Sequence, residues 1–471
     1  MAAKPLFIGG TSSNAGKSWM ATAVCAWLRR RGVAVAPFKA QNMSNNSYPC
    51  RQGGEIGRAQ VVQAEACGLE PEPAMNPILL KPNGAGASQV VVNGRVWKTL
   101  PPRAYYQHVA ELRGHVLAAY EDLARRFDVI VIEGAGSVSE VNLREKDLVN
   151  LDLVVRLRAP WMLVADIERG GVFASILGTV GLLTHDERAL LRGFAVNKFR
   201  GDVSLFEEGA RMLEARTRSH CLGIFPYAAD IAIDAEDSLA LQTEPRRLAP
   251  AGARIAIVHL PCMSNATDFR LLSWADWINA PPAADYDFVV LPGTKNSIGD
   301  LKWLHSSGLS AWILGQRRRG AAVLGLCGGF QMMGRRIDDP LGVEGGGSAP
   351  GLGLLPVVTV MKPDKRTEVR SATTRGGTRF TGYEIHMGET SFEGSAQPFA
   401  RFDDGTADGA CLPGAIGTYL HGALENPDVC VELFGVPIAS LAPKRGHYER
   451  LADWLEQHGR GLDRLLLDGA S

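Results

Sequence analysis

The sequence predicts an α/β protein of two domains, each built on a mostly parallel sheet. From residue 4 onward, short apolar runs with β-branched residues alternate with glycine-bearing loops and longer segments of helical periodicity. This alternation is typical of parallel sheets covered by helices. The chain also has 471 residues, more than a single hydrophobic core usually serves, so two cores are expected.

The first series of elements lies within residues 1–245. We expect its strands at residues 5–9, 33–38, 128–133, 161–166 and 193–197. Its clearest helices are expected at residues 18–31 and 103–126. Gly32 should end the first helix, because glycine readily adopts the positive φ that a helix end requires.

A domain boundary is expected at residues 243–252, which are rich in proline, arginine and small residues and show no periodicity. The second domain, residues 252–471, begins a new α/β series with strands expected at residues 254–260, 287–292 and 321–327. The glycine-rich stretch 342–353 should be an exposed loop. A helical tail is expected near the end, from the spacing of Tyr448, Leu451, Trp454 and Leu455.

Composition and charge narrow the class of protein. The formal net charge is zero, which gives no electrostatic reason to expect a nucleic acid or an anionic membrane as partner. Eight cysteines lie scattered without a C-x-x-C pair, a pattern that fits a reducing compartment. No apolar stretch approaches the roughly 20 residues that span a bilayer, and the N-terminus looks like a first strand. A soluble cytoplasmic protein is therefore expected.

The first chemical motif is the glycine-bearing loop GTSSNAGKS at residues 10–18, which follows the first expected strand and opens the first helix. Backbone N–H groups and the positive end of that helix would point at a phosphate. Lys17 would reach the β- and γ-phosphates, and Ser18 would ligate Mg²⁺. The loop is one residue longer than the common phosphate-binding pattern. The expected ATP-binding residues here are Thr11, Ser12, Asn14, Ala15, Gly16, Lys17 and Ser18.

Glu133 supports this interpretation. It ends the apolar run at residues 128–133 and is followed by Gly134. The carboxyl end of a central strand lies beside the phosphate loop in such sheets, so Glu133 could hold or orient the metal.

The second chemical motif centres on Cys327, which lies between glycines after an apolar run and before an expected helix. Small neighbours allow the sharp turn that exposes a nucleophile, and the helix start favours a thiolate. His421 is the best candidate base and His386 is its rival; reasoning from the residues leaves the two nearly level. Gly293, in the sequence LPGT, could supply a second oxyanion donor.

The second half resembles the class I, or triad-type, glutamine amidotransferases, which share a G-x-C-x-G-x-Q elbow. That resemblance implies a flavodoxin-like domain in which Cys327 forms a glutamyl thioester and His421 is the base. Gly293 and Gly328 would be oxyanion donors, and Gln331 would bind glutamine. Most members carry a glutamate two residues after the histidine. This chain has Ala423 there, so the sequence leaves open which group orients His421.

The first half resembles the dethiobiotin synthetase group of P-loop enzymes, in which ATP phosphorylates a substrate carboxylate. By that likeness Asn197 would read the adenine. Lys39 and Gln41, just past the second expected strand, are our candidates for contacts to phosphate or to a substrate carboxylate. Glu55 is the candidate for a second metal ligand.

Together the halves resemble the cobyric acid synthase family of cobalamin biosynthesis over essentially the whole chain. The matching stretches are residues 37–47, 55–60, 75–81, 166–175, 197–202 and 264–269. The resemblance implies amidation of the b, d, e and g carboxylates of adenosylcobyrinic acid a,c-diamide, a corrinoid substrate. ATP, Mg²⁺ and glutamine would be required.

Two other functions compete with this interpretation. The a,c-diamide synthases share the two-domain plan, but the sequence QNMSNN at residues 41–46 resembles the cobyric acid enzymes instead. Partition-type ATPases carry a lysine at the position of Ser12, and such a switch has no use for Cys327 and its glycines.

Overall fold

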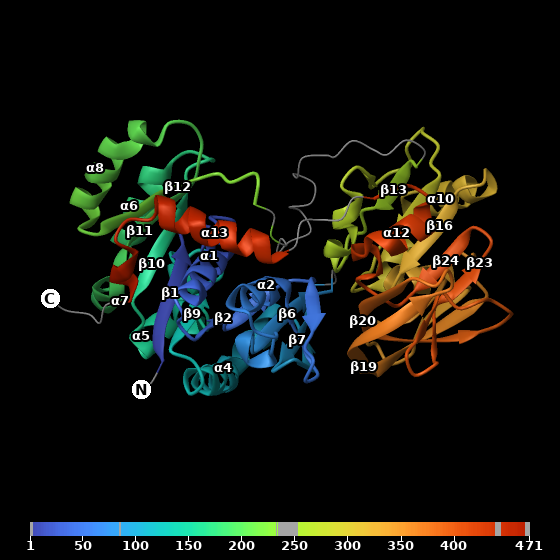
Figure 1. Cartoon of the computed structure of the whole chain (residues 1–471). Helices are drawn as coiled ribbons and strands as arrows, with labels where there is room; N and C mark the ends of the chain where they lie inside the picture. Colours follow the sequence, from blue (N-terminus) through green and yellow to red (C-terminus); the bar gives the residue numbers. More distant parts are fainter. Residues whose placement is uncertain (1–2, 84–85, 232, 234–252, 439–443, 467–471) are drawn as a thin grey trace.

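The computed structural model describes residues 3–83, 86–231, 233, 253–438 and 444–466. Its two domains lie side by side, the first coloured blue to green and the second yellow to orange (Figure 1). The boundary expected at residues 243–252 lies outside the described residues. Within the part that is described, no helix is long and apolar enough to cross a membrane.

The first domain is built on a six-stranded parallel sheet in the order β12-β11-β10-β1-β9-β2. All five strands expected from the sequence are present, and β12 is an additional edge strand. Their bounds are β1 (Lys4–Gly10), β2 (Val35–Phe38), β9 (Val129–Glu133), β10 (Trp161–Asp166), β11 (Leu191–Phe199) and β12 (His220–Pro226). Because β1 and β9 are parallel neighbours, the phosphate loop after β1 and Glu133 at the end of β9 lie together at the carboxyl ends of the strands.

Helices cover both faces of this sheet with separate apolar cores. The helices are α1 (Lys17–Arg30), α2 (Arg58–Cys67), α4 (Val109–Ala124), α5 (Leu151–Leu157), α6 (Val172–Gly181), α7 (His185–Leu190) and α8 (Glu207–Thr217). Helix α1 packs on one face, and α4, α5, α6 and α8 pack on the other. Gly32, just after α1, has the positive φ (78°) that was expected.

Two features of the first domain differ from expectation. The single helix expected at residues 103–126 is divided into α3 (Pro102–Tyr105), a 3₁₀ turn η2 (Tyr106–His108) and α4, so the chain bends before the long helix begins. Short strands form two small extra sheets beside the main one. These strands are β3 (Gln41–Met43), β4 (Ser47–Pro49), β5 (Glu55–Gly57), β6 (Ile78–Pro82), β7 (Ser88–Val92) and β8 (Arg95–Leu100).

The second domain contains a six-stranded sheet in the order β14-β13-β15-β16-β24-β23, parallel except for β23 at its edge. The strands are β13 (Ile255–Val258), β14 (Asp276–Ile278), β15 (Phe288–Leu291), β16 (Ala322–Leu326), β23 (Ala410–Leu412) and β24 (Ala415–Thr418). The helices are α9 (Ser297–Ser306), α10 (Leu309–Arg318), α11 (Gly328–Met333) and α12 (Pro427–Phe434). Strand β16 ends directly before Cys327, and β24 ends shortly before His421.

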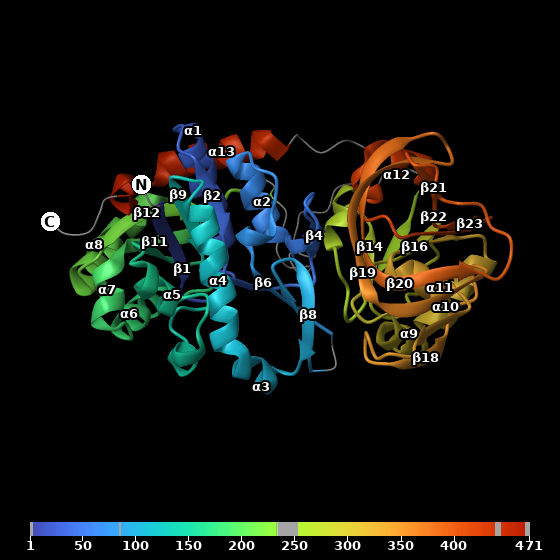
Figure 2. The ribbon, with the colours of Figure 1, turned by 90° about the horizontal axis from the view of Figure 1, so that it is seen from below.

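A second, strongly curved sheet completes this domain (Figure 2). Its longest strands, β19 (Val357–Thr374) and β20 (Arg379–Phe392), form an antiparallel hairpin. The others are β17 (Arg336–Asp339), β18 (Gly347–Pro350), β21 (Ala400–Phe402) and β22 (Ala407–Asp408). Strand β18 lies within residues 342–353, so the stretch expected to be a loop is partly a strand paired with β17.

The last long helix, α13 (Lys444–His458), follows the second domain in the chain but packs on the first (Figure 1). Tyr448, Leu451, Trp454 and Leu455 are buried in the same core as α1, and the indole N–H of Trp454 donates to the carbonyl of Pro226 at 3.0 Å. The sequence predicted the helix and its apolar face. Assigning it to residues 252–471 by chain order placed it with the wrong domain in space.

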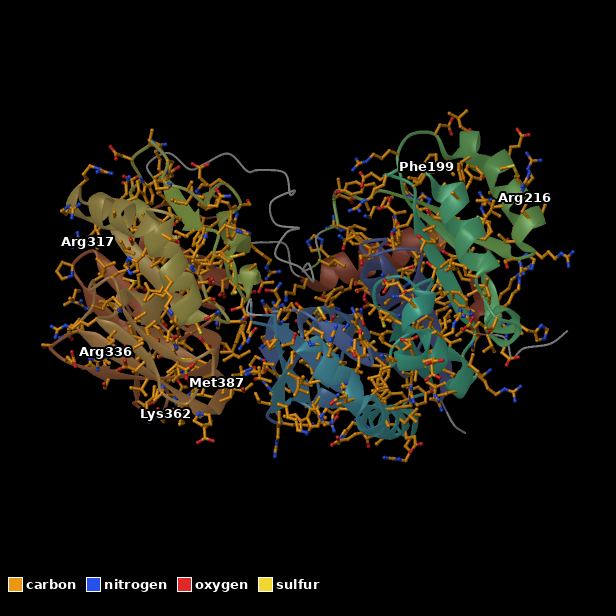
Figure 3. The ribbon with its side chains drawn as sticks, turned by 180° about the vertical axis from the view of Figure 1, so that it is seen from behind. Phe199, Arg216, Arg317, Arg336, Lys362 and Met387 are labelled. Carbon is orange, nitrogen blue, oxygen red and sulfur yellow. The ribbon has the colours of Figure 1, made fainter. Side chains whose placement is uncertain are left out.

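The two domains contact each other through β20 and the loops around it. Met387 on β20 lies on the side of the second domain that faces the first, whereas Arg317 lies on the outer side (Figure 3). The amide nitrogen of Gln89 approaches the Met387 sulfur at 3.4 Å, and Asn296 donates to the carbonyl of Asn83 at 3.1 Å. Several further polar contacts cross this interface beside the candidate site.

Candidate active sites

The phosphate loop folds as the motif predicted, between β1 and the start of α1. Gly16 at the helix start has φ 99°, and a Cβ there would lie 1.9 Å from the Asn197 amide nitrogen, so the position requires glycine. The Lys17 ammonium donates to the carbonyls of Ser12 (3.0 Å) and Gly136 (2.7 Å). It therefore lies across the loop, where a phosphate would be bound.

Glu133 lies beside this loop and is fully buried. Its Oε1 accepts from the Ser18 hydroxyl at 2.8 Å and from the Lys39 ammonium at 2.9 Å. Its Oε2 accepts from the amides of Gln60 and Gln63, which lie on one face of α2. The structure thus brings Ser18, Glu133 and Lys39 together beside the phosphate loop. Gln60 and Gln63 were not assigned, although their i, i+3 spacing was a signal that both face one target.

Asn197 also reaches the phosphate loop, from the end region of β11. Its amide donates to the carbonyl of Ala15 at 3.0 Å. The next residue, Lys198, donates to the carbonyl of Asn14 at 2.7 Å and pairs with Asp166 at 2.9 Å. These two side chains thus hold the backbone of the phosphate loop at Asn14 and Ala15. An adenine contact for Asn197 stays a prediction.

Gln41 and Glu55 bond to other partners. Gln41, at the start of β3, accepts a hydrogen bond from the Tyr105 hydroxyl. The Glu55 carboxylate does not join Ser18 and Glu133. It is buried in ion pairs with Lys81 of its own domain and Lys365 of the other. Burial alone would raise the pKa of this carboxyl group, but the two lysines outweigh burial and hold the pKa well below its usual range. In the structure Glu55 therefore belongs to the domain interface.

Cys327 lies at a sharp turn between β16 and α11, with φ 49° and ψ −107°. This left-handed conformation is strained for a residue with a side chain and is typical of nucleophile elbows. The flanking glycines are required by packing. A Cβ on Gly325 would lie 2.6 Å from the backbone of Gly329, and one on Gly329 would lie 2.0 Å from the Leu291 carbonyl.

His421 and Asp268 form a buried pair next to this elbow. The Asp268 Oδ2 lies 2.7 Å from His421 Nδ1, and Asp268 Oδ1 accepts from the backbone N–H of Gly422 at 2.7 Å. Both side chains are about 1% exposed. Nε2 of His421 is also buried and has no hydrogen-bond partner among the described residues. The group that orients His421 is thus Asp268, within residues 264–269, for which the sequence alone indicated no role.

Asp268 controls the charge of His421. Burial alone would lower the pKa of the imidazole, but the Asp268 carboxylate and the nearby Cys327 outweigh it and raise the pKa to about 10. The raised pKa favours the imidazolium form of His421 at neutral pH. Such a group can stabilise a thiolate and can donate a proton to a leaving amine.

His386, the rival base, is placed differently. Its ring stacks on Tyr419 at 3.8 Å between centroids, and its nitrogens face the Gly388 carbonyl (2.9 Å) and Glu384 (3.2 Å). Both ring nitrogens are occupied, although the ring lines the pocket of Cys327. The geometry favours His421 over His386.

The expected oxyanion residues meet at the elbow. A Cβ on Gly293 would lie 2.8 Å from Cε1 of His421, and one on Gly328 would lie 2.5 Å from the Thr294 methyl. Gln331 is buried one turn into α11, where it accepts from Ser297 at 2.7 Å and donates to Tyr419 at 3.3 Å. Glycines at 293 and 328 therefore allow the loop after β15 to pass against the Cys327 turn.

The cavity at Cys327 is shared between the domains. It has a volume of about 10 Å³, enough for roughly one water molecule. Ser264, Asn265, Lys295 and Glu344 of the second domain line it, together with Asn45 and Lys81 of the first. The nucleophile therefore faces the first domain across the interface.

Comparison with known proteins agrees with both halves of this description. Residues 6–240 match the CobQ/CobB/MinD/ParA nucleotide binding domain, and residues 254–429 match the CobB/CobQ-like glutamine amidotransferase domain. A cobyric acid synthase of Parabacteroides distasonis is 42% identical over 97% of both chains. A cobyric acid synthase of Syntrophobacter fumaroxidans is 43% identical, again over 97% of both chains. The chain belongs to the cobyric acid synthase family.

Proposed function

We propose that this protein converts adenosylcobyrinic acid a,c-diamide to adenosylcobyric acid by amidating its b, d, e and g carboxylates with nitrogen from glutamine. One observation carries the proposal. A single chain holds a buried Cys327–His421–Asp268 site and a phosphate loop with the Ser18–Glu133 pair, and it matches cobyric acid synthases over nearly its whole length.

The first domain would activate the carboxylate. The phosphate loop and Lys17 would bind ATP, and a substrate carboxylate oxygen would attack the γ-phosphorus to give an acyl phosphate and ADP. Lys39, which is buried beside Glu133, would place positive charge at this centre. Attack by ammonia on the acyl carbon then forms the amide and releases phosphate.

Mg²⁺ fits the residues at this site. Magnesium is usually held by one or two carboxylates together with phosphate oxygens and water, and the Ser18 hydroxyl and Glu133 carboxylate are adjacent oxygen donors beside the loop. These two residues would hold the ion. When bound, it would neutralise charge on the phosphates.

The second domain would release ammonia from glutamine. The Cys327 thiolate would attack the glutamine carboxamide carbon, and backbone N–H groups near Gly293 and Gly328 would stabilise the oxyanion. His421 would donate its Nε2 proton to the departing nitrogen, so that ammonia leaves and a glutamyl thioester forms. Water, deprotonated by His421, would then hydrolyse the thioester, which releases glutamate and restores the Cys327 thiolate and the His421 imidazolium.

The cysteines and the net charge bear on the compartment and the partners of the protein. All eight cysteines are free of disulfides, which supports work in the reducing cytoplasm, where Cys327 stays a thiol. The partner of the first domain would be the corrinoid itself. The zero net charge supports neither a nucleic acid nor a membrane as partner.

The experiment that tests the proposed function is product analysis with the purified protein. Adenosylcobyrinic acid a,c-diamide is incubated with ATP, Mg²⁺ and glutamine, and the corrinoid is followed by mass spectrometry. Stepwise replacement of carboxylates by amides, ending at adenosylcobyric acid, is expected. Omission of ATP should stop the reaction at the starting material. A corrinoid that stays unchanged with all components present contradicts the proposal.

A further inference from the structure

The segment that carries Asp268 is attached to the first domain by a reciprocal pair of hydrogen bonds. The backbone N–H of Ser47 donates to the side-chain oxygen of Asn265 at 3.0 Å. In return, the backbone N–H of Ala266 donates to the side-chain oxygen of Asn46 at 3.3 Å. All four residues are at most 3% exposed, so water does not compete for these bonds.

Asn265 links this contact to Asp268 within one turn. It precedes the 3₁₀ helix η6 (Ala266–Leu272) in a left-handed conformation with φ 54°, and its carbonyl accepts the backbone N–H of Asp268 at 3.1 Å. Asparagine tolerates this conformation better than most residues with a side chain. The position of Asp268 therefore depends on how Asn265 is held.

The same segment also contacts the oxyanion loop. The backbone N–H of Ser264 donates to the carbonyl of Gly293 at 2.9 Å. Residues 264–268 thus reach both His421, through Asp268, and the backbone next to the expected oxyanion donor. On the first-domain side, Asn46 is fixed by the Ser44 hydroxyl at 3.0 Å and by the start of α2, where Arg58 donates to its carbonyl at 3.1 Å.

We propose that Asn46 and Asn265 are positioning residues for the glutaminase reaction, and that the docked first domain thereby sets the geometry of Asp268 and His421. This inference rests on the proposed function of Cys327 and His421. Neither asparagine takes part in bond making. Their role is to hold the carboxylate within hydrogen-bonding distance of Nδ1, because small displacements of catalytic groups cost about 10²-fold in rate.

The test compares three variants of the full chain. Asn265→Gly keeps the left-handed backbone but removes the acceptor for Ser47. Asn265→Asp keeps both the acceptor and the tolerance of positive φ, so it should rescue activity. Asn46→Ala removes the other bond from the opposite domain. Gln89→Leu is the matched control, because it loses a side-chain contact across the same interface without contacting residues 264–268.

We expect Asn265→Gly and Asn46→Ala to lower the kcat of glutamine hydrolysis by about 10- to 100-fold, with KM changed little. Amidation with free ammonia should stay within about two-fold of wild type, since the first-domain site is untouched. The alkaline limb of the pH profile should move to lower pH, because a displaced Asp268 no longer raises the pKa of His421. Asn265→Asp should recover part of the kcat that Asn265→Gly loses, and Gln89→Leu should behave as wild type.

Three results overturn the inference. One is wild-type glutaminase in both Asn265→Gly and Asn46→Ala. Another is a change in KM alone, which would make Asn265 a glutamine contact. A third is a parallel loss of glutamine- and ammonia-dependent activities, which would make the bonds structural only. Absence of glutaminase in the wild-type protein would instead contradict the proposed function, so the two failures are distinguishable.

Discussion

Asp268 sets the orientation and the charge of His421 from a position 153 residues away in the chain. The carboxylate holds Nδ1, so that Nε2 is the ring nitrogen available to Cys327. Its negative charge also keeps a fully buried imidazole protonated, against the desolvation cost that would otherwise expel the proton. In most class I amidotransferases a glutamate two residues after the histidine is available for this role; here Ala423 occupies that place.

Replacing Asp268 with asparagine should lower glutaminase activity about 10²- to 10⁴-fold. An asparagine amide would donate to Nδ1 and thus favour the tautomer with its proton on Nε2. Without the carboxylate the pKa of His421 falls from about 10, so the alkaline limb of the kcat/KM profile should shift to lower pH. Steady-state glutamate release across a pH series checks both effects.

Ammonia-dependent amidation serves as the internal control for Asp268→Asn and should be unaffected. If the variant hydrolyses glutamine at the wild-type rate with an unchanged pH profile, Asp268 has no role in orienting the base.

Strand β24 delivers His421 to the site and is itself held by a buried carboxyl group. Asp408, on β22, accepts from the Thr418 hydroxyl and from the Tyr419 backbone N–H at 3.1 Å. Burial is the main reason that the pKa of Asp408 is raised to about 7. The element carrying the base therefore depends on a group that changes charge near neutral pH.

This pKa predicts how stability changes with pH. Between about pH 4 and about pH 7 the folded state holds a proton on Asp408 that the unfolded chain has lost, so this stabilising contribution disappears as the pH rises through about 7. Asp408→Asn should remove that dependence. Urea unfolding at about pH 5 and about pH 8 should show a gain in the free energy of unfolding for the variant mainly at the higher pH. An equal effect at both pH values would contradict the assignment.

At the scale of the whole molecule, the chain returns to its first domain after completing the second. Trp454 on α13 packs against Phe225 with tilted rings, 4.8 Å between centroids, and meets Trp19 edge-on at 6.0 Å between centroids. Arg30 on α1 also pairs with Asp453 and Glu456 at the surface of α13. The second domain is thus preceded and followed in the chain by segments that belong to the first domain.

Trp454→Ala should destabilise the first domain by about 3–5 kcal/mol, since it removes a large buried side chain from the core shared with α1. The expected result is earlier thermal loss of ammonia-dependent amidation. Gln457→Ala, on the exposed side of the same helix, is the control and should change little. If both variants inactivate at the wild-type temperature, α13 does not stabilise the first domain.

The parts of the fold and site that depend on local sequence were predictable. An apolar run, a glycine loop and a helix start specify the phosphate loop within a few residues, and the glycines around Cys327 specify its turn. The small sheets β3-β6-β7-β8 and β4-β5 were missed because their strands are short and show little alternation. Helical periodicity also gave no sign of the bend at Tyr106–His108.

Contacts between distant residues were not predictable from one sequence. Asp268 could be recognised as the partner of His421 only once β13 and β24 were placed in one sheet. The sequence offered Glu55 as a candidate second metal ligand, but its carboxylate pairs with Lys81 and Lys365. Its partner Lys365 lies 310 residues away, across the domain interface. Likewise, the apolar face of α13 did not reveal which domain it covers.

The most direct test of the central claim is amidation of adenosylcobyrinic acid a,c-diamide by Cys327→Ala, with ATP and Mg²⁺ and with either glutamine or free ammonia as nitrogen source. The account predicts that the variant loses glutamine-dependent amidation and keeps ammonia-dependent amidation near the wild-type rate, because Cys327 serves only nitrogen release. Retention of glutamine-dependent amidation by the variant, or loss of both activities in a folded protein, would contradict the account.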